Sequence, residues 1–233
     1  MVRYEQSQPT GTMIIADPFY ELIDAESLAR TAVTMTDARW IQAGSDVAGA
    51  MVFVGDGDGR LYVPEYAPLS PVLRQLLRLP DTPNYHSQTP PTFDLYALPS
   101  LPEMELLAEP VTFADKITLE GYELLPTNSS STVTLLTRWL VQQPLPPHLT
   151  IFVHLLNANG EIVAQYDGFD AAPTALRTGD RLIQLHPLAL PAQEGPFKLQ
   201  MGLYTPADGQ RLTHSGSPAE LLILATDLHF DEK

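Results

Sequence analysis

Short apolar runs separated by turn-forming residues recur along the C-terminal part of this 233-residue chain. In the run 132–142, Val133, Leu135, Trp139 and Val141 fall on one face of a strand, because successive side chains of a strand point to opposite sides. Trp139 is in phase with its apolar neighbours, so we expect it in a core. Regularly spaced short strands are typical of sandwiches and barrels. We therefore predict an all-β immunoglobulin-like or jelly-roll-like sandwich over residues 103–233.

One joint between two such runs requires a choice between a ligand site and a turn. In "IFVHLLNANGEIVAQYDG", Ile151–Gly168, the residues Asn157–Gly160 separate two strand-like segments. Asn and Gly tolerate the positive φ angles that tight hairpins require, and Asn-Gly is a strong hairpin signal. We interpret this joint as a turn.

The N-terminal part has a mixed pattern. "MIIAD" ending at Asp17 is typical of a buried strand, and Pro18 with early acidic residues predicts a helix over 18–35. "SPVLRQLLRL", 70–79, places its apolar residues at helical spacing after a serine and a proline. Alternation of strands and helices predicts a small α/β unit.

Proline is concentrated between the two patterns. Residues 79–102 are rich in proline, which lacks the N–H that helices and sheet ladders use, so this segment is expected to be an irregular connector. We place a boundary near Pro102. The prediction is an α+β two-domain chain, with an α/β unit over 1–102 and the sandwich over 103–233.

Composition removes several classes of function. The net charge of −15 repels phosphate backbones and anionic lipids, so neither nucleic acid nor an acidic membrane is an expected partner. The absence of cysteine excludes disulfides, thiolate catalysis and cysteine-ligated metals. No apolar run approaches the roughly 20 residues that span a bilayer, so we expect no direct membrane insertion and a soluble chain as given.

The recognisable motifs of catalysis do not occur. "VGDGDGRLYV", 54–63, lacks the later oxygen ligands of a calcium loop and the helix of a dinucleotide site, so we interpret it as a turn. The six histidines are scattered, with no H-x-x-x-H pair, and no G-x-S-x-G occurs. We predict no catalytic, cofactor-binding or metal-ligating residue.

Aromatic residues beside carboxylates are the remaining candidates for ligand contact. Several aromatics fall in the second domain, and sugar-binding sandwiches use such side chains as platforms, although aromatics also fill sandwich cores. Tyr166 lies next to acidic residues in the sequence. The predicted contact residues are Tyr166, Asp167, Phe169 and Asp170.

The second half resembles a known family. The pattern "W…FVHLL…G…AQ.DG…G…L.LP…G.F.L..GLY.P..G.RL", spread over residues 113–224, is similar to the β-sandwich at the C-terminus of some bacterial membrane glycosyltransferases of the dolichyl-phosphate-mannose–protein mannosyltransferase type. The first half is more loosely similar to the segment that precedes this sandwich. The resemblance implies that catalysis resides in an acidic loop between transmembrane helices, which this chain lacks, so it transfers no catalytic residue.

Three hypotheses follow. The first is a non-catalytic accessory module on the extracytoplasmic side of a membrane, with a glycan or a membrane-embedded glycosyltransferase region as partner. The second is a purely structural spacer. The third is a soluble carbohydrate-active enzyme with a site at the domain junction, since clefts between domains are common active sites.

Overall fold

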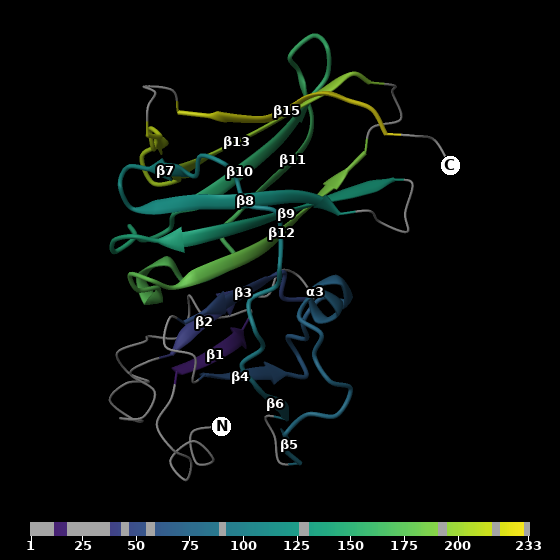
Figure 1. Cartoon of the computed structure of the whole chain (residues 1–233), viewed down its shortest axis with the longest axis vertical. Coiled ribbons are helices and arrows are strands. Elements are labelled where there is room, and N and C mark those ends of the chain that lie inside the picture. The colour runs from purple at the N-terminus through teal and green to yellow at the C-terminus, as the bar shows by residue number, and fades with distance from the viewer. Residues whose placement is uncertain are drawn as a thin grey trace. The chain divides into compact units, whose positions relative to one another are not determined.

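The chain divides into two compact units. A computed structural model describes residues 12–17 (backbone only), 38–42, 47–54, 59–88, 92–125, 131–190, 195–215 and 220–230 (Figure 1). The first unit consists of Met1–Glu103 together with Asp170–Leu182, and the second of Met104–Phe169 together with Ile183–Lys233. No helix in the described ranges is long and apolar enough to cross a membrane.

The first unit is built on a mixed sheet. Its strand order is β2-β1-β4-β6-β5, with β1 parallel to both of its neighbours and the remaining pairs antiparallel. The strands are β1 (Thr12–Asp17), β2 (Arg39–Gln42), β4 (Gly59–Pro64), β5 (Tyr85–His86) and β6 (Phe93–Ala97). A further strand, β3 (Ala50–Phe53), is buried throughout.

The helix predicted after Ser70 is present but short. Helix α3 (Pro71–Leu76) begins where the Ser70 hydroxyl accepts a hydrogen bond from the Leu73 N–H at 3.1 Å, with proline in the first turn. The expected helix over 18–35 lies outside the described residues. The prediction of an α/β unit is not supported, because the helices in the described part of this unit are one six-residue α-helix and one three-residue 3-10 helix.

The segment Asp170–Leu182 is fixed to the first unit by main-chain and side-chain bonds. Ala172 N–H donates to the Trp40 carbonyl at 2.9 Å, beside an antiparallel bridge between Ile41 and Ala171. The Arg39 guanidinium donates to the Asp180 carboxylate at 2.5 Å and 3.3 Å, and both side chains are only 4% exposed. A buried pair needs such two-point geometry to offset the loss of hydration. The 3-10 helix η3 (Pro173–Ala175) lies in this segment.

The second unit contains two sheets, and every strand pair with a described register is antiparallel. The first sheet has the order β12-β9-β8-β7, and the second has the order β11-β10-β13-β14, with β15 also paired to β13. The strands of the first sheet are β7 (Val111–Phe113), β8 (Ile117–Leu125), β9 (Thr132–Val141) and β12 (Arg181–Ala189), of which residues from Ile183 onward belong to this unit. Those of the second are β10 (Thr150–Leu156), β11 (Ile162–Gly168), β13 (Phe197–Thr205), β14 (Gln210–Arg211) and β15 (Leu222–Leu228).

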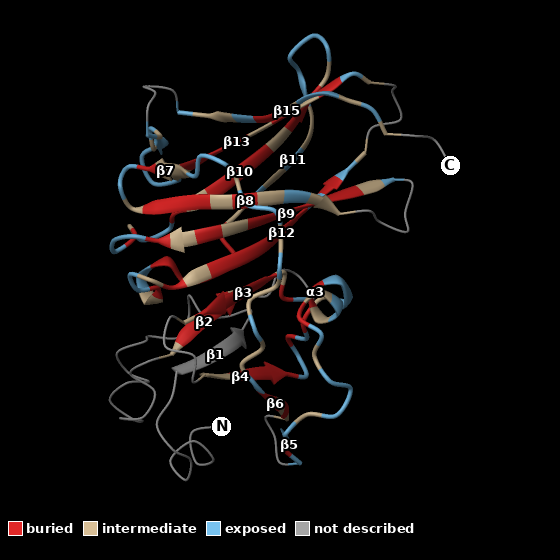
Figure 2. Ribbon diagram, viewed as in Figure 1, coloured by how far each residue is buried: buried red, intermediate tan, exposed pale blue. Residues whose placement is uncertain are grey.

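The two sheets face each other across a shared core, which confirms the predicted β-sandwich. The Tyr122 hydroxyl of β8 donates to the Leu224 carbonyl of β15, and the Gln184 side chain of β12 donates to the Gly168 carbonyl at 3.0 Å. Figure 2 shows buried residues along the strands of both sheets. The predicted core face of β9 is confirmed, because its apolar members are buried: Val133, Leu135, Trp139 and Val141.

A polar group lies inside this core. Thr137, on the same face as Trp139, accepts a hydrogen bond from the indole N–H at 2.9 Å, and its hydroxyl lies 2.8 Å from Nε2 of His186. His186 is fully buried, and among the described residues its Nδ1 has no hydrogen-bond partner. Burial lowers the pKa of His186 to about 3, because a charged imidazole would lose its hydration. The sandwich therefore folds around a neutral histidine.

This histidine makes the stability of the second unit sensitive to acid. Since the folded pKa lies below the ordinary value of 6.5, its contribution is fully present above pH 6.5 and is lost as the pH falls toward 3. We expect His186→Gln to make the urea midpoint fall less between pH 7 and pH 4 than it does in the parent chain. The exposed His148 provides the control, and His148→Asn should keep the parental slope. Equal slopes in all three proteins would contradict a neutral buried His186.

Candidate functional site

The predicted contact residues separate in the structure. Tyr166 and Asp167 are neighbours on β11 and so point to opposite faces of the sheet. The Tyr166 ring packs edge-on against His186 of the other sheet, with ring centroids 5.3 Å apart and planes at 85°. Asp167 is exposed on the outer face, whereas Phe169 and Asp170 are 5% and 9% exposed. Burial of Phe169 and Asp170 removes them as surface contacts, and Asp167 alone of the four is freely exposed.

The joint at Asn157–Gly160 is confirmed as a turn. The Asn157 side-chain oxygen accepts hydrogen bonds from the N–H groups of Asn159 and Glu161, each at 3.0 Å. Gly160 has φ of 80°, the left-handed conformation that glycine adopts without strain. The asparagine oxygen is therefore occupied by the backbone of its own loop.

Asp167 belongs to a cluster on the outer face of the second sheet, which we call the outer-face cluster: Phe152, His154, Asp167, Tyr204 and Arg211. The strand register brings these residues together, because Phe152 of β10 lies opposite Asp167 of β11 and Gly202 of β13. The His154 Nε2 is 3.6 Å from one Asp167 oxygen, and the Tyr204 hydroxyl donates to the other at 3.4 Å. Four strands thus contribute to one patch.

Aromatic packing forms the floor of the outer-face cluster. The Phe152 ring is 4.9 Å from the His154 ring and 6.1 Å from the Tyr204 ring, and the Arg211 guanidinium carbon lies 5.1 Å above it. Such cation–aromatic stacking orients the guanidinium while leaving its N–H donors available. A side chain at Gly202 would put a Cβ 2.5 Å from the Phe152 ring. Glycine at that position therefore allows the ring to lie close against β13.

The environment sets the charges of the outer-face cluster. Burial lowers the pKa of His154, and Arg211 lowers it further while Asp167 opposes both. Burial and the neighbouring Asp167 raise the pKa of Tyr204. At neutral pH the imidazole is therefore uncharged and the phenol keeps its proton.

Two members of the outer-face cluster keep hydrogen-bonding capacity. Both contacts of the Asp167 carboxylate are long, at 3.6 Å and 3.4 Å, whereas good bonds to a carboxylate are 2.7–2.9 Å. The Arg211 guanidinium makes no hydrogen bond or ion pair within the described ranges. The Asp167 carboxylate, a strong acceptor, and the Arg211 guanidinium, a strong donor, thus lie at one surface. The partly exposed ring of Tyr204 lies beside them.

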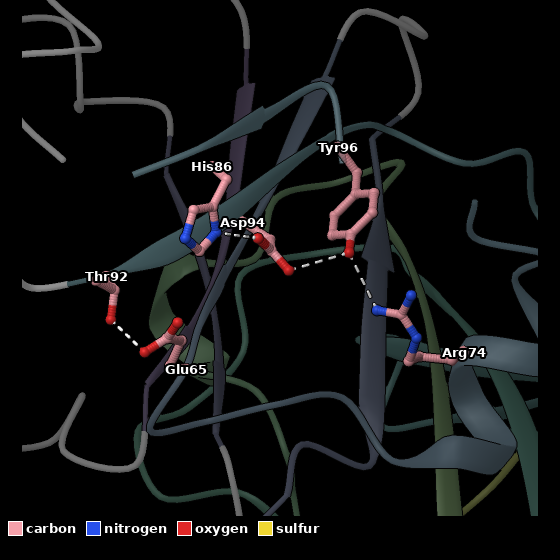
Figure 3. A network of polar contacts seen from close by, with 6 residues as sticks. All are labelled: Glu65, Arg74, His86, Thr92, Asp94 and Tyr96. Carbon is pink, nitrogen blue, oxygen red and sulfur yellow. Dashed lines mark hydrogen bonds and ion pairs between the residues drawn. The ribbon is translucent and has the colours of Figure 1, made fainter. Parts of the chain in front are cut away.

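A second polar network lies in the first unit (Figure 3). Arg74 donates to the Tyr96 hydroxyl at 3.2 Å, that hydroxyl donates to Asp94 at 3.3 Å, and Nδ1 of His86 is 2.8 Å from the other Asp94 oxygen. These bonds connect α3, β6 and β5, and each side chain already has its partner. Figure 3 also draws a separate bond from Thr92 to Glu65. We interpret the network as structural, because it links helix α3 to the edge of the sheet, and not as a ligand-binding site.

The first unit also has a small pocket of about 250 Å³. The described residues that line it are six uncharged residues and one arginine: Phe53, Val54, Leu98, Pro99, Ser100, Leu101 and Arg181. None of these described lining residues is a carboxylate, the group that supplies the acid–base pair in glycoside hydrolysis. Within the described ranges, no three His, Asp or Glu residues are grouped so as to hold a metal ion.

Comparisons with known proteins provide little. No family model matches the chain, and no curated protein matches it. Among solved structures, the C-terminal domain of Wzt has a TM-score of 0.40 and 9% sequence identity, over 55% of this chain and 81% of that one.

Sequence reasoning missed His154 and Arg211. Arg211 is separated from Asp167 by more than forty positions, and only the pairing of β14 with β13 brings it over Phe152. The alternation of β10 contained a usable signal, since Phe152 and His154 share a face. The shared face indicates a binding surface only when the strand pairing, which puts Asp167 opposite Phe152, is also known.

The position of Tyr166 predicts a structural effect of its removal. Tyr166→Ala should lower the free energy of unfolding by about 2 kcal/mol, because the ring fills space against His186 between the sheets. Thermal or urea unfolding measures this loss. Gln165→Ala, at the exposed neighbouring position, should change stability by less than about 0.5 kcal/mol. An unchanged stability of Tyr166→Ala would place its ring on the surface and contradict the register.

Proposed function

We propose that this chain is a non-catalytic, extracytoplasmic accessory module that binds a neutral glycan through the outer-face cluster, beside a membrane-embedded glycosyltransferase. The observation that supports the glycan most directly is the juxtaposition of Asp167 and Arg211, each with unused hydrogen-bonding capacity, around the aromatic floor of Phe152.

A carboxylate, a guanidinium and aromatic rings at one surface match the chemistry of a sugar. Each hydroxyl donates one hydrogen bond and accepts others, so neighbouring hydroxyls are held best between a carboxylate that accepts and a guanidinium that donates. The neutral imidazole of His154 and the phenol of Tyr204 can do both. The apolar face of a pyranose packs on an aromatic ring, and Tyr204 presents such a ring at the rim.

Charge favours a neutral sugar over an acidic one. The chain has a net charge of −15, and Asp167 adds a local negative charge inside the outer-face cluster. The net charge of the chain would repel an anionic polysaccharide. Arg211 and Asp167 together are close to neutral, which suits a ligand without charge.

The fold is compatible with an accessory role. One sheet contains the order β12-β9-β8 and the other β11-β10-β13-β15, so the second and fifth strands pair and the third and sixth pair, which supports an immunoglobulin-like sandwich. We therefore propose an immunoglobulin-like rather than a jelly-roll-like arrangement. The resemblance to the C-terminal sandwich of membrane glycosyltransferases supports the proposed context.

The proposal is tested by glycan-array binding followed by substitution in the outer-face cluster. We expect saturable binding to a neutral glycan, and Arg211→Ala or Asp167→Asn should weaken it at least about tenfold, because each change removes a charge-assisted hydrogen bond of roughly 1.5–3 kcal/mol. Both positions are exposed, so the unfolding midpoint should change little.

Lys198→Ala is the matched control. Lys198 lies on β13 opposite Leu156, at the far end of the same face from Tyr204, and its loss changes the net charge as Arg211→Ala does. Binding should survive this change. If Lys198→Ala and Arg211→Ala weaken glycan binding equally, the effect comes from the net charge and not from the outer-face cluster. If no glycan on the array binds, the spacer hypothesis is favoured.

A further inference from the structure

Among the strands that the structure describes, β11 is the last one at its end of the second sheet. In the described part of the unit its strand neighbour is β10, and its seven residues include a single charge, Asp167. Ile162 at its start is 49% exposed. A long edge with few charges presents unpaired main-chain groups that favour pairing with another strand.

Two other edge strands of this unit, β7 and β15, carry protection against pairing. Strand β7 has three residues, and its free side is occupied where Ser215 N–H donates to the Thr112 carbonyl at 2.7 Å. Strand β15 pairs with β13 through two register shifts and contains Asp227 at φ of 56°. Irregular or very short edge strands resist pairing, and β11 lacks both protections over Ala164–Gly168.

The pattern of β11 fits a second copy of itself. Its ladder with β10 is regular from Ala164 to Gly168 and shifts only beyond Ala164, so the centre of the regular stretch is Tyr166. An antiparallel two-fold pairing about that centre puts Gln165 opposite the partner subunit's Asp167, twice in one interface. The amide donates where the carboxylate accepts. A pairing centred on Asp167 would instead oppose two carboxylates, which is unfavourable.

We propose that two copies of this chain pair through β11 in antiparallel register, joining their second sheets into one continuous sheet. The two-fold axis of such a pair is perpendicular to the sheet, so both outer-face clusters lie on the same side. On the proposed function, a repeating glycan could then bind both clusters, with the gain in affinity that two linked sites provide.

Charge substitutions at Gln165 test the pairing and its register. Gln165 is exposed, so Gln165→Lys and Gln165→Glu should both fold. Sedimentation equilibrium without glycan should show a dimer in the parent chain. Gln165→Lys should lower its Kd about tenfold by placing a cation opposite the partner subunit's Asp167, and Gln165→Glu should raise it about tenfold. The opposite signs distinguish this register from a generic edge, where lysine weakens pairing.

Thr226 supplies the control on the opposite edge strand. Thr226→Lys and Thr226→Glu make the same charge changes at an exposed residue of β15, and they should change the Kd by less than about threefold. The proposal is overturned if the parent chain is monomeric at the highest concentration at which it stays in solution. It is also overturned if the two positions respond alike. Because no sugar is present, failure here leaves the glycan proposal standing, and the reverse also holds.

Discussion

The antiparallel register of β10 with β11 and β13 determines which side chains of the second unit meet at the surface and which meet in its core. Phe152 is opposite Asp167 on one side and Gly202 on the other, and from this follows the placement of a carboxylate beside an aromatic floor. A slip by one residue would exchange Asp167 for Tyr166 on the outer face. The Asn157 turn and the buried contact of Tyr166 with His186 both oppose such a slip.

Local sequence signals predicted the features that depend on neighbouring residues. The Asn-Gly turn and the serine-capped helix after Ser70 rest on interactions within a few positions, and the buried face of β9 was visible in the alternation of its own residues. Regular strands separated by turns were enough to indicate a sandwich. These features follow from the period of the strand, the φ angle of glycine and the capping of a helix, which do not depend on the rest of the fold.

Features that depend on distant pairing were not predicted. The segment Asp170–Leu182 joins the first unit through Arg39 and Asp180, which are 141 positions apart, and no pattern near either residue indicates this. Tyr166 was predicted as a surface contact because it lies beside acidic residues, but adjacent residues of a strand point to opposite faces. The two buried members of that prediction, Phe169 and Asp170, lie just after β11 ends, where alternation no longer indicates orientation.

The polar residues of the second unit divide into two groups with different consequences. Inside the sandwich, Thr137 of β9 and His186 of the neighbouring strand β12 are enclosed, and their hydrogen bond joins two strands of one sheet. On the outer face, Asp167 and Arg211 contact aromatic neighbours and retain unused hydrogen-bonding capacity. The buried group stabilises the fold but makes it less stable at acidic pH. The outer-face group has the unused hydrogen-bonding capacity that we propose for glycan binding.

The most direct test of the central claim is a chemical-shift titration of the isotope-labelled chain with neutral oligosaccharides. The account predicts saturable shifts that concentrate at the backbone amides of His154, Asp167, Tyr204 and Arg211, on four different strands of one face. Shifts confined to the first unit, or an unchanged spectrum with every sugar, would contradict it.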